Sequence, residues 1–219
     1  MKKEFYTFKK EQPKKTIIRN YTLADADPLI QIQREAFPPP FPEELLWNHD
    51  QLEAHTTLFP EGALCVEVEG EIAGSMTALR VNLQPGEKHT WNEITDQGYI
   101  RNHQPNGSSI YVVDICVSPR FRGLGLGKEL MLAMYETVVY LGADRLVGGS
   151  RIPGYQKVKE KMSPEEYVSA VKNGTLQDPV VTFLMKCGRV PVELLPGYLD
   201  DEESNNNAVL MEWKNPFKG

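Results

Sequence analysis

IYVVDICVSPRFRGLGLGK, residues 110–128, is the stretch that decides the fold of this chain. It begins with an apolar run over 110–117, which predicts a strand. It continues into RGLGLG, residues 122–127, and a helix-like stretch over 128–141 follows. Glycines can adopt positive φ and let the backbone approach a ligand closely. Because the first turn of a helix also presents unpaired N–H groups, we predict a phosphate-binding turn between this strand and this helix.

Two common phosphate-binding loops do not match this turn. A P-loop requires G-x-x-x-x-G-K-[ST], but Arg122 stands at the first glycine position and Glu129 follows Lys128. A dinucleotide fingerprint requires G-x-G-x-x-G, and Leu126 or Leu130 occupies the position of its third glycine. A nucleoside triphosphatase and a dinucleotide-binding enzyme are therefore excluded, which leaves the pattern R-x-x-G-x-G.

This pattern, after the strand end at Val117, resembles the acetyl-CoA signature of the GNAT acyltransferase superfamily; a structural glycine turn is the alternative. The resemblance implies an α/β (α+β) GNAT fold, with a mixed central sheet of about six to seven strands flanked by helices and with splayed central strands. It also implies that backbone groups at the strand end bind the pantetheine arm and that the loop amides hold the pyrophosphate. The residues implied in binding acetyl-CoA are Ile115, Cys116, Val117, Arg122, Gly123, Leu124, Gly125, Leu126, Gly127 and Lys128.

Several short strings narrow the resemblance. They are TWNEIT at 90–95, GSRIPGY at 149–155, DPV at 178–180, and PGYL from 196 through to Glu212-Trp213. They resemble a branch of bacterial GNAT proteins whose members are often joined to a carbon-nitrogen hydrolase domain. No hydrolase follows in this sequence, so we expect a stand-alone acyltransferase module, with such a hydrolase as a possible partner.

Composition fits one domain that acts on small molecules. The 219 residues are 41% hydrophobic and 25% charged, and we expect a flexible tail over 1–14 before a single domain over 15–219. The net charge of −6 argues against nucleic acid as a partner. The three widely spaced cysteines form no CxxC pair, and no long apolar run occurs, so we expect free thiols, a cytoplasmic location and no membrane partner. A homodimer is possible.

The remaining elements alternate as an α/β layer requires. A capping box at Thr22 and Asp25 predicts a helix up to Phe37, and Ser163-Pro164 predicts the start of another helix. The other predicted strands cover residues 16–21, 63–69, 71–81, 145–147, 189–195 and 207–213. The other predicted helices cover residues 43–58 and a segment that begins at 178.

Two residues of the signature strand are candidates for catalysis. Attack on a thioester needs a neutral amine, whose pKa of around 10 keeps it protonated at pH 7, so a base or a water relay is required. Asp114 is the leading candidate for this base; the alternative is a structural carboxylate. Tyr111 lies where related acyltransferases often carry a catalytic acid or base, although a wall or orienting role suits a tyrosine better. The main-chain amide of Val117 or Cys116 is the expected donor to the oxyanion.

Other residues are candidates for binding the acceptor. We expect the long insertion over 84–109 to cover the acceptor site, and we expect Trp91 within it to contact the acceptor. Arg151 could pair with a carboxylate of the acceptor or hold its own loop, and Tyr155 follows it in the same loop. The histidines of the insertion lack a third ligand at metal spacing, so no metal is expected. In many family members a tyrosine protonates the departing thiolate four residues before the helix-ending glycine, but here that position is Leu184.

These features predict an acetyl-CoA-dependent N-acetyltransferase. It would act on a small amine or amino-acid-like acceptor by direct transfer through a tetrahedral intermediate. Two alternatives stay open. The lack of a tyrosine at 184 allows a non-catalytic acyl-CoA-binding sensor, and the resemblance to hydrolase-fused proteins allows an interaction module that partners a carbon-nitrogen hydrolase.

Overall fold

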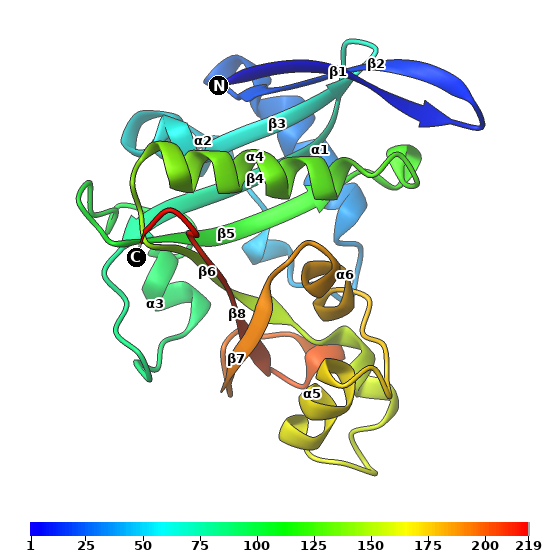
Figure 1. Cartoon of the computed structure of the whole chain (residues 1–219), viewed down its shortest axis with the longest axis vertical. Coiled ribbons are helices and arrows are strands. Elements are labelled where there is room, and N and C mark those ends of the chain that lie inside the picture. Colours follow the sequence, from blue (N-terminus) through cyan, green and yellow to red (C-terminus); the bar gives the residue numbers. More distant parts are fainter. Residues whose placement is uncertain (219) are drawn as a thin grey trace.

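The computed structural model describes residues 1–218, which form an eight-stranded mixed sheet with helices on both faces (Figure 1). The strand order is β1-β2-β3-β4-β5-β6-β8-β7, and only the β5–β6 pair is parallel. The bounds are β1 Lys2–Lys9, β2 Gln12–Asn20, β3 Ala63–Val68, β4 Glu71–Val81, β5 Ser109–Val117, β6 Arg145–Arg151, β7 Val190–Leu195 and β8 Ala208–Lys214. The GNAT fold class predicted from the sequence is confirmed, with one or two strands more than expected.

An N-terminal hairpin accounts for the additional strand. Residues 1–14, expected as a flexible tail, instead supply β1 and the start of β2, which pair from Lys2 with Arg19 to Lys9 with Gln12. Lys10 and Glu11 make the turn with positive φ. Exposed residues alternate along β1 with more buried ones from Lys2 to Thr7, and the Thr7 hydroxyl contacts the Thr16 hydroxyl at 2.9 Å. Alternation of this kind suits an edge strand with one face in solvent.

Helices cover both faces of the sheet. The α4 helix (Leu126–Tyr140) crosses the front of β3–β5 in Figure 1, and α1 (Ala26–Ala36) packs on β4 and β5 from behind. The others are α2 His49–Leu58, α3 Trp91–Thr95, α5 Pro164–Lys172 and α6 Val181–Lys186. The predicted capping boxes at Thr22 and Ser163 are both present. No helix within 1–218 is long and apolar enough to cross a membrane.

The centre of the sheet is splayed, as expected. Residues 109–111 of β5 pair with residues 145–147 of β6, and the two strands diverge beyond Tyr111. On the other side of β5, Ala78 faces Val112 and Thr77 faces Asp114, so Val113 is the extra residue of a β-bulge. The bulge bends β5 away from β6 and opens a slot between the two strands.

Candidate active site

The bulge in β5 shapes the site. The indole Nε1 of Trp91 donates a hydrogen bond of 3.1 Å to the carbonyl oxygen of Val113, which binds the insertion to the bulged residue. Within 1–218, β6 does not pair with β5 from Val112 onward, so backbone groups on this edge of β5 are available to a ligand. An extended molecule can therefore lie along the end of β5.

A groove of about 490 Å³ runs from the end of β5 to α4 and α6. All but one of the predicted acetyl-CoA residues line it: Ile115, Cys116, Val117, Arg122, Gly123, Gly125, Leu126, Gly127 and Lys128. The exception is Leu124, which is buried and lines a different depression beside Lys9 and Lys14. The opposite wall includes Val180 and Phe183. The sequence therefore predicted one side of this groove and not the other.

The glycine loop has the geometry of an anion-binding turn. Gly123 and Gly125 have φ of +86° and +74°, and a Cβ atom at either would meet no atom within 4 Å. Gly125 is the N-cap of α4, so the loop leads directly into the positive end of that helix. Gly127 has a different role from Gly123 and Gly125. It lies inside the helix, where a Cβ would come to 3.1 Å from the Phe183 ring, so its role is close packing.

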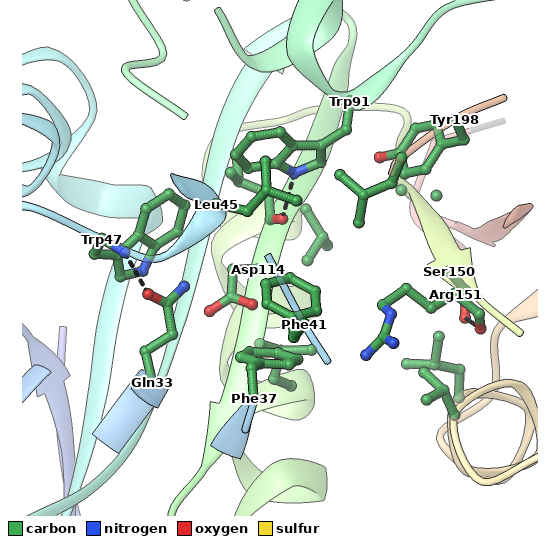
Figure 2. A pocket seen from close by; sticks show the side chains of 18 of the residues that line it. Gln33, Phe37, Phe41, Leu45, Trp47, Trp91, Asp114, Ser150, Arg151 and Tyr198 are labelled. Atoms are coloured by element: carbon green, nitrogen blue, oxygen red, sulfur yellow. Dashed lines mark hydrogen bonds between the residues drawn. The ribbon is translucent and has the colours of Figure 1, made fainter. Parts of the chain in front are cut away.

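A second cavity, of about 160 Å³, adjoins the groove (Figure 2). Both cavities are lined by Phe37, Ile115, Val180 and Leu184, so they meet at these four residues. Five aromatic side chains contribute to the walls of the second cavity: Phe37, Phe41, Trp47, Trp91 and Tyr198. A CoA thioester held in the groove would therefore direct its acyl end toward this second cavity.

Asp114 faces this pocket. Its Oδ2 atom is buried and has no hydrogen-bond partner within 1–218, and burial raises the pKa of the carboxyl to about 7. Figure 2 shows the Gln33 side chain beside it, fixed by a hydrogen bond from the Trp47 amide to its Oε1. A carboxyl that has one oxygen without a partner and a pKa near neutrality can gain and lose a proton at physiological pH.

Tyr111 lies behind the pocket and does not line it. Its hydroxyl is 2.8 Å from the Tyr198 hydroxyl and 2.9 Å from Nε2 of His89, and it accepts a hydrogen bond of 3.2 Å from the Gly149 amide. Burial raises the pKa of Tyr111 well above its usual value. This geometry favours the orienting role, since Tyr111 holds Tyr198, whose ring does line the pocket.

Two of the three predicted acceptor residues line the pocket, and the third does not. Trp91 and Arg151 line the pocket, but the Arg151 guanidinium already binds Asp201 at 2.6 and 2.7 Å and Glu203 at 2.7 Å. Tyr155 is buried outside the pocket, where its hydroxyl donates to the Met162 carbonyl at 3.1 Å. Its position favours a structural role, and Arg151 is held in its own loop by acidic partners.

Arg189 is a pocket residue that the sequence did not predict. It is 3% exposed and lines the pocket, and its Nε has no hydrogen-bond partner within 1–218. Burial lowers the pKa of its guanidinium to about 10. An arginine after a helix-ending glycine is usually a solvent-exposed residue, and no local pattern marks this one as buried. Leu184 lies where the two cavities meet, so the position of the family tyrosine is an apolar wall here.

The model of the acetyltransferase (GNAT) family matches residues 26–148. The chain belongs to the GNAT acetyltransferase family. It is 54% identical over 201 residues to the "uncharacterized N-acetyltransferase YkwB" of Bacillus subtilis, covering 91% of this chain and 89% of that protein. It is also 39% identical over 204 residues to the "probable hydrolase YhcX" of the same organism, covering 92% of this chain but only 39% of that protein. The fusion to a hydrolase is therefore not shown for this GNAT chain.

Solved structures agree with the fold. The loading GNATL domain of CurA from Lyngbya majuscula has a TM-score of 0.78 at 22% identity, covering 91% of this chain and 98% of that one. The GphF GNAT-like decarboxylase in complex with isobutyryl-CoA has a TM-score of 0.77 at 24% identity, covering 90% of this chain and 98% of that one. At this level of identity both structures support the GNAT fold alone.

Proposed function

We propose that this protein is an acetyl-CoA-dependent N-acetyltransferase for a small amine or amino-acid-like acceptor. The observation that carries the proposal is the buried carboxyl of Asp114, whose Oδ2 atom has no hydrogen-bond partner within 1–218, in a pocket that adjoins the groove of the glycine loop. The relative YkwB is 54% identical to this chain and is named an N-acetyltransferase, which supports the same function.

In this proposal the groove residues fit coenzyme A. The amides around Gly123 and Gly125 and the start of α4 would hold the diphosphate, because both glycines are in the left-handed region with open space beside them. The free edge of β5 would bind the pantetheine arm. Acetyl-CoA supplies an activated acetyl group, and a main-chain N–H of Cys116 or Val117 would donate to its carbonyl oxygen.

Asp114 would then accept the proton of the attacking amine. A general base works best when its pKa lies near the operating pH, and burial raises the pKa of Asp114 to about 7. The aromatic walls of the pocket exclude water from the carboxyl and the amine. Leu184 cannot donate a proton to the departing thiolate. Because the pKa of a thiol is near 8.5, the thiolate can leave without being protonated.

A kinetic assay tests this proposal. We expect saturable, acceptor-dependent release of free thiol from acetyl-CoA when the protein is supplied with a panel of small amines and amino acids. If calorimetry finds that CoA binds while no amine in the panel releases thiol, the protein is an acyl-CoA sensor.

A role beside a carbon-nitrogen hydrolase is the second candidate. It is favoured by the 39% identity to YhcX, a probable hydrolase of which this chain spans 39%. The measurement is co-purification of the tagged chain from its own host. Recovery of a hydrolase, together with an absence of acetyl transfer, would favour the interaction module.

A further inference from the structure

Arg189 is a buried cation that lacks a counter-ion in the protein. It follows α6 after Cys187 and Gly188, and one terminal nitrogen donates to the carbonyl oxygen of Met211. Within 1–218 no carboxylate oxygen lies within 4 Å of the guanidinium, and Nε makes no hydrogen bond. A guanidinium carries five N–H donors in a planar fork, and burial of such a charge without a partner is unfavourable. The Arg189 guanidinium therefore lacks both a counter-ion and an acceptor for its Nε–H within residues 1–218.

The groups packed around Arg189 do not supply negative charge. They are Tyr111, Tyr198, Tyr135 and Cys187, and burial raises the pKa of each. For Tyr135 the pKa rises to about 12. All four are therefore neutral at physiological pH, and the positive charge of Arg189 persists.

The other two charged groups of the pocket differ from Arg189. Arg151 is neutralised by Asp201 and Glu203, and its guanidinium stacks 5.0 Å from the centre of the Phe41 ring. Asp114 is the one carboxylate among the residues that line the pocket, and it lies beyond ion-pair distance of Arg189. Within residues 1–218 the pocket thus presents one carboxyl and one guanidinium that form no ion pair, beside aromatic side chains.

We propose that Arg189 binds a carboxylate of the ligand. The inference rests on the proposed function and specifies its substrate class: a small molecule that places a carboxylate at Arg189 while its reacting atoms lie near Asp114. A guanidinium fork matches a carboxylate in geometry and charge. The carboxylate has two possible sources, an amino-acid acceptor or the far end of a dicarboxylic acyl chain on coenzyme A.

Binding measurements separate these sources without relying on turnover. In one arm, calorimetry compares succinyl-CoA with butyryl-CoA. In the other, it compares leucine with isoamylamine, each added to the protein already saturated with CoA. We expect the carboxylate ligand to bind roughly tenfold more tightly, or better, in one of the two arms.

Arg189→Met should abolish that preference, because methionine fills a similar space without charge or donors. Arg34→Met, at an exposed position on α1, is the matched control and should retain it. Because Arg189→Met removes a buried charge that has no counter-ion, this variant should not have a lower melting temperature. If Arg189→Met nevertheless fails to fold, Arg189→Lys, which keeps a cation, should retain part of the carboxylate preference.

Two results would overturn the inference: equal affinity for both members of each pair in the natural protein, or a carboxylate preference that survives in Arg189→Met. Its failure is distinguishable from failure of the proposed function. If acetyl transfer to amines proceeds without a carboxylate preference, only the role of Arg189 is lost. If carboxylate binding depends on Arg189 while no transfer occurs, only the transferase is lost.

Discussion

At the scale of single residues, the proposed role of Asp114 as the base predicts how activity depends on pH. As the base, it would be active once ionised, so turnover should rise with pH through about 7 and then level off. Asp114→Asn should remove this limb and lower kcat/KM by roughly 10²- to 10⁴-fold, with little change in CoA affinity. The measurement is kcat/KM across pH 5 to 9. Full activity of the variant over this range would exclude Asp114 as the base.

The same carboxyl makes stability depend on pH in a defined direction. Its pKa is raised from 3.8 to about 7 in the folded protein, so the unfolded chain loses this proton at lower pH than the folded one. Its contribution to stability is therefore full below about pH 4 and is lost as the pH rises to about 7, a change of roughly 4 kcal/mol. Denaturant unfolding of Asp114→Asn between these pH values should lack this decline. An identical decline in both proteins would contradict the raised pKa.

Asp114 and Arg189 also show what the sequence can predict about a site. Asp114 was identified because it lies in the signature strand beside the glycine loop, where the local order of residues fixes its neighbourhood. Arg189 was missed because its burial depends on α6, on β8 and on Tyr111, Tyr135 and Tyr198, which come from other parts of the chain. Tyr155 was overestimated for the converse reason, since its place in the chain does not show that its hydroxyl turns to Met162.

At the scale of elements, the entry to α4 depends on the backbone of Gly125. Valine at φ of +74° costs roughly 1–2 kcal/mol and places a branched side chain where the phosphate would lie, so Gly125→Val should abolish measurable CoA binding. Gly70→Val is the matched control, because Gly70 has φ of +86° and equally open surroundings in the β3–β4 turn. Calorimetry should find similar destabilisation in both variants but lost CoA binding in Gly125→Val alone. Unchanged affinity would remove the loop from the binding site.

Elements with local signals were predictable and those without were not. The capping boxes at Thr22 and Ser163 involve side chains three residues apart, so the sequence alone specifies them. Strand β1 was missed because its lysine-containing sequence lacks a continuous apolar run, and because it is stabilised by pairing with β2, which in turn pairs with β3. The bulge at Val113 could not be placed, because it is defined by the register with β4.

At the scale of the whole molecule, the sheet consists of two parts joined by a short parallel contact. Strands β1–β5 form one part, and β6, β7 and β8 form the other with α5 and α6 (Figure 1). Three residue pairs connect β5 to β6, and the groove is lined by β5 and α4 on one side and α6 on the other. A molecule bound in the groove would therefore bridge the two parts.

Bound CoA should accordingly stabilise both parts together. At 100 times its Kd a ligand adds about 2.7 kcal/mol, which corresponds to a rise in melting temperature of roughly 5–10 °C for a domain of this size. Hydrogen exchange should slow in α6 and β7 as well as in β5 and α4, because local opening of the C-terminal part would break contacts with CoA. Gly125→Val should show neither effect. Protection confined to β5 and α4 would mean that the ligand contacts one wall of the groove and that the two parts open independently of it.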